Sequence, residues 1–231
     1  MKVLIVTNTR VENEAVRKIW NGILKNAKTI QTFPTCEGKI EDNVIIYVHL
    51  GGSVSAISHL LSMINPNMVL IAGEMIGRYD IVECGDIVIA TEIFTVVNKL
   101  ENWRITHAMK ANSDTFKYTT DDSKNVEVHQ GPVEFSLTTP EIRNQKDWHN
   151  IGEVSAKPDV IGIEIGNANI YELIQLYNNM TNSVINYLLI KGVSSNGTQL
   201  EGVNEQDLKR IAAERSAKWI LQFCQEELTY F

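Results

Sequence analysis

Residues 68–94, MVLIAGEMIGRYDIVECGDIVIATEIF, carry the strongest fold signal in the chain. They open with five apolar residues, 68–72, in the pattern of a strand that is covered on both faces. Gly73 and Gly77 bracket a predicted turn or close approach of the backbone to a ligand, and residues 86–90 form a second buried strand. Because ligands in open α/β sheets bind beyond the carboxyl ends of strands, this turn is a candidate site. The alternative interpretation is two core strands joined by an ordinary loop.

Predicted strands and helices alternate along the rest of the chain, which favours an α/β sheet in a single domain of residues 1–231. Residues 98–125 are polar and are interpreted as a long excursion, either a lid or an oligomer contact. The other predicted strands are 2–7, 28–33, 43–50, 126–133, 160–163 and 184–190, with a polar loop at 191–202. The predicted helices are 10–24, 54–64, 140–148, 166–176 and 205–228.

Composition excludes several functional classes. The 231 residues are 44% hydrophobic and 21% charged, with a formal net charge of −7, which argues against a nucleic acid or an anionic membrane surface as the main partner. Three cysteines without CxxC spacing indicate a reducing compartment, and the five histidines show no metal-ligand spacing. No signal-peptide pattern and no apolar run of roughly 18 residues is found, so we expect a cytoplasmic protein without metal or cofactor.

Acidic residues near the ends of predicted strands are the candidate catalytic groups. Glu12 lies in the first turn of the predicted helix 10–24, where the helix dipole alone would explain it. Glu164 interrupts the apolar segment VIGIEIG, where a buried charge is costly unless it is paired or functional. Its alternative role is to cap the following helix. Motifs of a serine hydrolase, a phosphate-binding P-loop and a Rossmann fold are missing from the sequence.

Six segments, taken in order, resemble the nucleoside phosphorylase and nucleosidase superfamily, most closely the methylthioadenosine/S-adenosylhomocysteine nucleosidases. They are KVLIVTNTRVENEAV, HLGGSVSAISHLLSMINPNMVLIAGEMIGRYDIVECGDIVIA, VHQGPVEFS, VIGIEIGNANIYEL, LLIKGVSSNGT and AAERSAKWILQF. The likeness is thin over residues 95–125. The resemblance implies a three-layer α/β/α fold with a central mixed, partly barrel-like sheet, in a homodimer or a higher homo-oligomer. It also implies cleavage between a ribose and its base, by water in nucleosidases and by phosphate in phosphorylases.

The resemblance assigns roles to individual residues. Glu12 matches the glutamate that activates the attacking water. Glu164 matches the glutamate that binds ribose hydroxyls and stabilises an oxocarbenium-like transition state, and Ile163 replaces the methionine beside it. Phe135 falls near a position that lines the base pocket. A buried carboxylate below the sugar helps most when the departing base leaves positive charge there, and a second carboxylate activates water as in inverting glycosidases.

Two departures from the family pattern shape the functional prediction. The turn that holds phosphate in phosphorylases reads GEMIG here, and Glu74, with no arginine before it and Arg78 as its potential partner, would repel phosphate. The aspartate that protonates a leaving purine is replaced within Ser194-Ser195-Asn196. Therefore Asn196 binds the base, another acid serves, or the substrate has a better leaving group. Lys191 stands where an arginine is common.

The predicted function is hydrolysis of a purine nucleoside or a related compound, with a small-molecule nucleoside as the only partner besides other copies of the chain. A phosphorylase and a catalytically silent nucleoside-binding homologue are the alternatives. The predicted catalytic residues are Glu12 and Glu164, and the predicted substrate-binding residues are Gly73, Glu74, Phe135, Ile163, Ser195 and Asn196.

Overall fold

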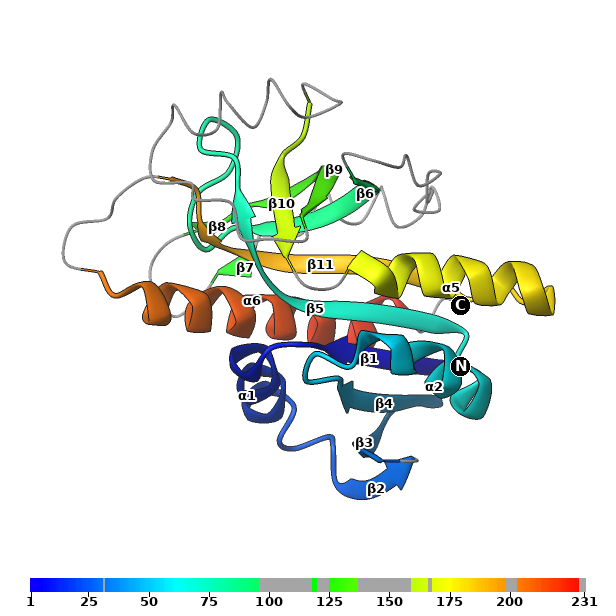
Figure 1. The fold of residues 1–231 in the computed structure, drawn as a ribbon. Coiled ribbons are helices and arrows are strands. Elements are labelled where there is room, and N and C mark those ends of the chain that lie inside the picture. The colour runs from blue at the N-terminus through cyan, green and yellow to red at the C-terminus, as the bar shows by residue number, and fades with distance from the viewer. Residues whose placement is uncertain are drawn as a thin grey trace.

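The computed structural model describes residues 1–30, 32–95, 118–119, 125–136, 159–165, 168–197 and 203–228 (Figure 1). Its strands are β1 (Lys2–Thr7), β2 (Asn26–Ile30), β3 (Phe33–Ile40), β4 (Asn43–His49), β5 (Met68–Gly77), β6 (Ile87–Thr95), β7 (Tyr118–Thr119), β8 (Asn125–Val126), β9 (Val128–Ser136), β10 (Gly162–Ile165) and β11 (Asn186–Ser195). Its helices are α1 (Arg10–Ile19), the short 3-10 helix η1 (Val54–Ala56), α2 (Ile57–Ile64), α5 (Ala168–Thr181) and α6 (Glu205–Glu226).

One mixed sheet runs through the described part of the chain, in the order β10-β9-β6-β11-β5-β1-β4-β3-β2. Its centre is parallel, because β1 pairs in parallel with β4 and β5, and β5 with β11. Strand β10 also pairs antiparallel with β5, so the strands β10, β9, β6, β11 and β5 close on themselves. The predicted fold, an α/β/α sandwich around a partly barrel-like mixed sheet, is confirmed.

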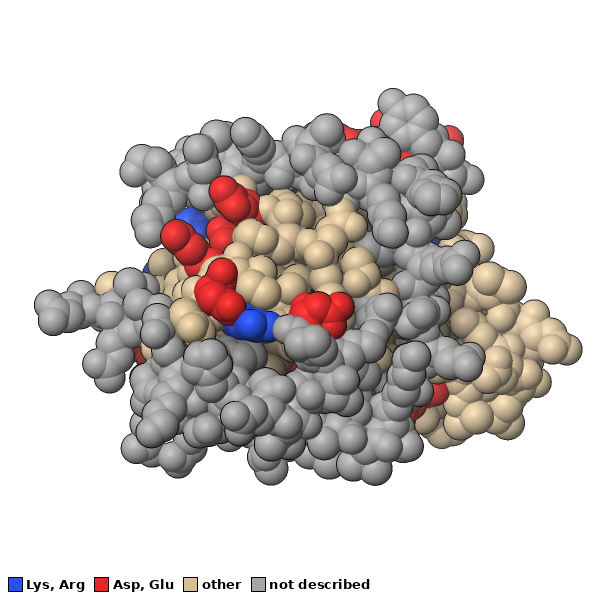
Figure 2. Space-filling view, turned by 90° about the horizontal axis from the view of Figure 1, so that it is seen from above, with Lys and Arg blue, Asp and Glu red and all other residues tan. Residues whose placement is uncertain are grey.

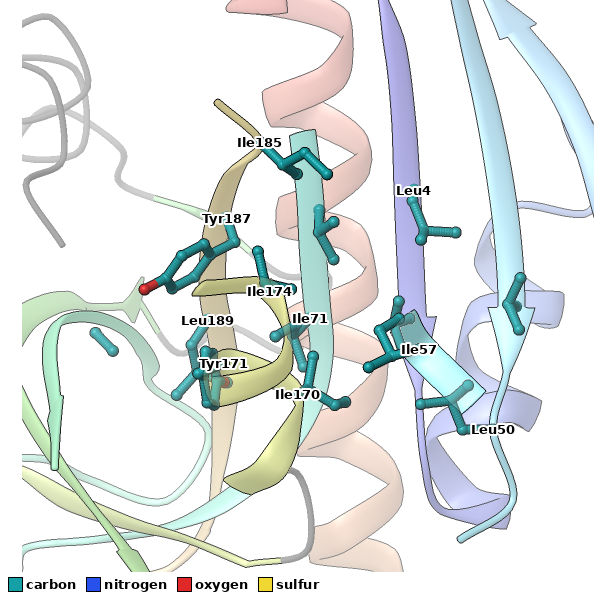
Figure 3. Packing of buried hydrophobic residues seen from close by; sticks show 14 of the residues in the cluster. Leu4, Leu50, Ile57, Ile71, Ile170, Tyr171, Ile174, Ile185, Tyr187 and Leu189 are labelled. Carbon is teal, nitrogen blue, oxygen red and sulfur yellow. The ribbon is translucent and has the colours of Figure 1, made fainter. Parts of the chain in front are cut away.

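Two apolar cores cover the two faces of the sheet, which explains the unbroken apolar runs of the central strands. Leu4 of β1 belongs to the core under α2 and α5, which includes the labelled residues of Figure 3. Its neighbour Ile5 belongs to the opposite core, with Trp20 after α1 and Ile220 of α6. The indole Nε1 of Trp20 donates to the carbonyl of Ala217 at 3.1 Å, which joins α1 to α6.

Helix α6 packs unusually close to β11 and β5. A Cβ atom at Gly192 would lie 2.1 Å from the carbonyl oxygen of Ala212, so only glycine fits there. One turn further along α6, the Ser216 hydroxyl donates to the carbonyl of Ile190 at 2.7 Å and accepts from the amide of Gly73 at 3.0 Å. This helix therefore fixes the two strands at the level of Gly73 and Gly192.

Two predicted loops are strand in the structure. The predicted turn at Gly73 to Gly77 is wrong, because β5 continues to Gly77 and Gly73 bends it with a φ of +147°. The predicted polar loop 191–202 is wrong at its start, because β11 extends to Ser195. The β5–β11 ladder keeps both strands extended, since it continues to the pair Ile76 and Ser195.

Other boundaries differ by a few residues. The predicted strand 28–33 is confirmed in part, because residues 28–30 belong to β2 and Phe33 begins β3. The predicted helix 10–24 ends at Ile19. The predicted helix 140–148 and, except for residues 118–119 and 125, the predicted excursion 98–125 lie outside the described residues. None of the described helices combines the length and the apolar character that crossing a membrane requires.

The contact at Gly192 predicts a stability effect. Gly192→Ala forces α6 away from β11, because the new methyl group would overlap a backbone oxygen, so the free energy of unfolding should fall by about 1–3 kcal/mol. Chemical denaturation measures the change. Gly22→Ala is the control, because a Cβ there meets nothing within 4 Å. Equal stability of the two variants would contradict this account of the packing.

Candidate active site

Three charged side chains from distant parts of the chain meet inside the protein. The ammonium of Lys191, in β11, lies 2.9 Å from Oε1 of Glu12, in α1, and 3.3 Å from Oε1 of Glu164, in β10. Lys191 and Glu164 are fully buried and Glu12 is 2% exposed. The two predicted catalytic carboxylates therefore converge, and they do so on a buried lysine.

Glu12 is held by donors on both of its oxygens. Oε2 accepts the amides of Asn8 at 2.8 Å and Thr9 at 2.9 Å, and Thr9 caps α1 in return, which is a capping box. Oε1 accepts Lys191 and, at 3.3 Å, the amide of Glu74. Burial opposes ionisation of Glu12, but Lys191 and the amides keep its pKa below the ordinary value. Helix capping and the ion pair are thus both true of this residue.

The lysine is charged for the same reason. Burial alone would lower the pKa of Lys191, but Glu12 and Glu164 raise it above its ordinary value. The ammonium also donates to the carbonyl of Ala72 at 3.1 Å. Since the pKa of Glu12 is depressed, its stabilising effect is complete above about pH 4.5 and is lost as the pH falls further. Since that of Lys191 is raised, its effect is complete below about pH 10.5 and is lost at higher pH.

Gly73 is a glycine because the strand passes against this cluster. A Cβ atom there would lie 1.6 Å from Oε1 of Glu12 and 2.5 Å from the ammonium of Lys191. Its φ of +147° is also one that side chains rarely adopt. The sequence pattern correctly indicated a close approach of the backbone at Gly73, although the group approached is a side chain of the protein itself.

Glu74 forms a second polar pair at the edge of the cluster. Its half-buried carboxylate accepts the hydroxyl of Ser194, which also points to the carbonyl of Met75 at 3.1 Å. The suggested pairing of Glu74 with Arg78 is wrong, because Arg78 forms its ion pair with Asp80 at 2.8 Å. Ser194 lies at a register shift between β11 and β5, and this bulge turns its side chain toward Glu74.

The remaining predicted site residues lie on β9, on β10 and at the end of β11. Phe135 of β9 is 4% exposed and is the register partner of Glu164, and Ile163 is fully buried beside it. Asn196 donates from Nδ2 to the carbonyl of Val82 at 3.0 Å, which ties the end of β11 to the loop between β5 and β6. Ser195 is half-buried and ends β11. Their roles in substrate binding stay predictions.

Tyr171 of α5 lies near the charged cluster. Its ring packs against Tyr187 at a centroid distance of 5.8 Å, and the side chain is 1% exposed. Its hydroxyl has no hydrogen-bond partner among the residues that the structure describes. Burial and the nearby charge of Glu164 raise the pKa of Tyr171 well above its ordinary value, so the phenol keeps its proton at neutral pH.

Sequence reasoning noted Lys191 but did not place it in the site. The lysine follows the apolar run YLLI, and it was assigned to the start of a polar loop. The signal that identified Glu164, a charge that interrupts an apolar segment, is equally present in LLIKGV. In the described ranges, no three His, Cys, Asp or Glu residues are grouped so that they could hold a metal ion.

The buried ion cluster predicts that Lys191 is needed for stability. Lys191→Met leaves two buried carboxylates without their cation and should lower the free energy of unfolding at pH 7 by about 3–5 kcal/mol, as measured by chemical denaturation. Lys191→Arg keeps the positive charge and should lower the free energy of unfolding by a smaller amount.

Lys28→Met is the matched control for Lys191→Met. It removes an exposed lysine that pairs with Glu37 at 2.6 Å, and it should cost less than about 1 kcal/mol. If Lys191→Met lowers the free energy of unfolding no more than the control does, the ion pairs of Lys191 with Glu12 and Glu164 do not stabilise the fold.

Solved structures with the same architecture exist. The 5′-methylthioadenosine/S-adenosylhomocysteine nucleosidase of S. pneumoniae, solved with a transition-state inhibitor, superposes with a TM-score of 0.72 at 16% identity, over 97% of this chain and 99% of that one. The enzyme of Colwellia psychrerythraea, in complex with adenine, gives 0.70 at 15% identity over 97% and 94%. That of Helicobacter pylori gives 0.69 at 11% over 98% of each chain.

The likeness is one of structure. No protein-family model matches the chain, and no curated protein matches it. The expected resemblance is nevertheless confirmed at the level of the fold: this chain has the fold of the methylthioadenosine/S-adenosylhomocysteine nucleosidases.

Proposed function

We propose that the protein is an N-ribosyl hydrolase that cleaves the glycosidic bond of a purine nucleoside or a related compound. The observation that carries this proposal is the convergence of Glu12 and Glu164 on the buried Lys191. The fold shared with nucleosidases supports it, since it is a fold in which solved relatives hold adenine or a transition-state inhibitor. A shared fold alone does not fix a function, so the argument rests on the site.

In the proposed reaction, the bond between C1′ of the ribose and the base nitrogen breaks, and its electron pair leaves with the base. Glu164 stabilises the positive charge that develops on the sugar, which favours the transition state over the bound substrate. Water attacks C1′ and loses a proton to Glu12. Because the pKa of Glu12 is lowered, it is a weak base, and it suits a step in which the water becomes acidic only as it bonds to the cationic sugar.

Lys191 acts on both carboxylates in this mechanism. It lies within ion-pair distance of both carboxylates and lowers the pKa of Glu12, although that side chain is removed from water. It also orients Oε1 of each. We therefore assign Lys191 a positioning role rather than a chemical one.

Water rather than phosphate is the proposed acceptor. Glu74 stands at the edge of the cluster and is paired with Ser194, not with an arginine. Glu12, Glu74 and Glu164 lie near the ammonium of Lys191, and Lys209, whose charge also acts on Glu74, is paired with Glu205 at 2.7 Å. These four carboxylates against two ammonium groups give a net formal charge of −2, which disfavours a phosphate dianion. A nucleoside-binding protein without turnover is the second candidate, because Ser195 stands where the resemblance expects an acid.

We further propose that residues 1–231 act as one domain in a cytoplasmic homo-oligomer. Large apolar side chains on neighbouring elements are exposed and supply surface for such contacts: Met63 of α2, Leu176 and Met180 of α5, and Val184 after α5, with exposures of 58%, 52%, 76% and 83%. Figure 1 shows α5 at the edge of the molecule, where a second copy can reach it.

Removal of either carboxylate tests the hydrolase. Glu12→Gln and Glu164→Gln should each lower kcat for base release by about 100-fold or more, because each removes charge stabilisation or proton transfer at the reacting carbon. Base release is followed chromatographically over a panel of nucleosides, with and without phosphate, and circular dichroism confirms folding.

Glu14→Gln is the matched control for these variants. Glu14 lies two residues from Glu12 on α1, but its exposed side chain pairs with Arg10, so the activity of the variant should equal that of the wild type. Release that requires phosphate would overturn the choice of water, and nucleoside binding without any release would favour the silent homologue.

A further inference from the structure

A neutral purine is a poor leaving group, because it departs as an anion unless an acid protonates it. General acid catalysis contributes about 100-fold to 10,000-fold to such steps. The strand end where the resemblance expects that acid carries Ser194, Ser195 and Asn196. None of these side chains is a proton donor of suitable pKa at neutral pH.

The polar groups described around this strand end already have other tasks. The Ser194 hydroxyl is directed to Glu74 and to the Met75 carbonyl, and the Asn196 amide donates to Val82. The side chains of the strand end itself, Ser194, Ser195 and Asn196, therefore supply no acid for the leaving base.

The same site has an additional negative charge. Glu74 adds a carboxylate beside Glu12, to which its own amide donates at 3.3 Å, and it acts on the charge of Lys191. Lys209 of α6 also acts on the charge of Glu74, but it is itself paired with Glu205 at 2.7 Å. Negative charge therefore still exceeds positive charge around Glu74, and charge that is not compensated is costly in a partly buried place. Figure 2 shows that the described surface on one face also bears more acidic than basic side chains. A ligand with a cationic base compensates the negative charge, and its base can leave without an acid.

From these two observations we infer that the substrate is a nucleoside whose base carries a positive charge before cleavage, either an N7-alkylated purine or a pyridinium N-riboside. This inference rests on the proposed N-ribosyl hydrolase function and names its substrate class. The cationic base accepts the electron pair of the breaking C1′–N bond and leaves as a neutral molecule, so no acid is needed. Water supplies the new C1′–O bond and releases one proton to Glu12.

During this reaction the positive charge moves from the base to the sugar, and in each place a carboxylate stabilises it. It lies first on the base, where the half-buried Glu74 favours binding, and it then moves to the sugar, where the fully buried Glu164 stabilises it. The missing acid at Ser195 and the additional carboxylate of Glu74 thus have a single explanation.

The experiment compares guanosine with 7-methylguanosine, which differ by one methyl group and one positive charge. We expect the wild-type protein to release base from 7-methylguanosine with a kcat/KM at least ~100-fold above that for guanosine, the factor that an acid would otherwise supply. Nicotinamide riboside should also be cleaved. Glu12→Gln and Glu164→Gln should abolish the release from both cations.

Two variants test the two halves of the argument. Ser195→Asp introduces an acid at the strand end, which should accelerate base release from guanosine. The ratio of kcat/KM for 7-methylguanosine to that for guanosine should therefore fall at least tenfold. Glu74→Gln should raise KM more for 7-methylguanosine than for guanosine. Glu83→Gln, which makes the same change of charge on an exposed residue of the neighbouring loop, is the control and should leave the ratio unaltered.

Each outcome decides the matter. Equal kcat/KM for guanosine and 7-methylguanosine, sensitive to Glu12→Gln, would overturn the cationic substrate and leave the hydrolase intact. No release from any of these nucleosides would overturn both. A preference for the cation that persists undiminished in Ser195→Asp and Glu74→Gln would show that it does not arise from these residues, and it would equally overturn the inference.

Discussion

The burial of the Lys191 ammonium is the constraint on which the site depends. An isolated charge in the interior costs several kcal/mol, and here it is met by Glu12, Glu164 and the carbonyl of Ala72. The three side chains come from α1, β10 and β11, so the charges are compensated only after the barrel has closed and α1 has docked. Folding and assembly of the site are therefore one event, and a chain that leaves any of the three elements undocked has an unpaired buried charge.

The burial of Lys191 explains why small residues, Gly73, Gly192 and Ser216, lie around the charged cluster. Gly73 lets β5 pass against the carboxylate of Glu12, and Gly192 lets α6 approach β11 closely enough for Ser216 to bind the Gly73 amide and the Ile190 carbonyl. These contacts fix the backbone on both sides of Lys191. The lysine, with three donors on a flexible stem, then reaches both carboxylates without any strand having to move.

The layered α/β fold and most of the candidate site residues could be predicted from the sequence, but the place of Lys191 at the centre of the site could not. Unbroken apolar runs predicted the buried strands β1 and β5, a charge that interrupts an apolar segment predicted Glu164, and the family resemblance predicted the role of Glu12. The full lengths of β5 and β11 could not be predicted, because their last residues are held extended by pairing with each other, a contact between segments about 120 residues apart. Lys191 was placed in a loop for the same reason. Strand β3 was missed because its sequence, FPTCEGKI, is polar on one side and contains both proline and glycine.

Helix capping and catalysis are alternative interpretations of Glu12, and in the structure capping occupies only one of its two carboxylate oxygens. The capping box binds Oε2 to the amides of Asn8 and Thr9, which leaves Oε1 directed at Lys191. A carboxylate fixed in this way loses little rotamer freedom when a ligand arrives, and preorganised charge is worth more in a site from which water is excluded. Burial raises the pKa of Glu12, and Lys191 lowers it more than the two amides do, although each amide also favours the ionised form. The contacts that begin the helix thus orient the proposed base and add to the effect of Lys191 on its charge.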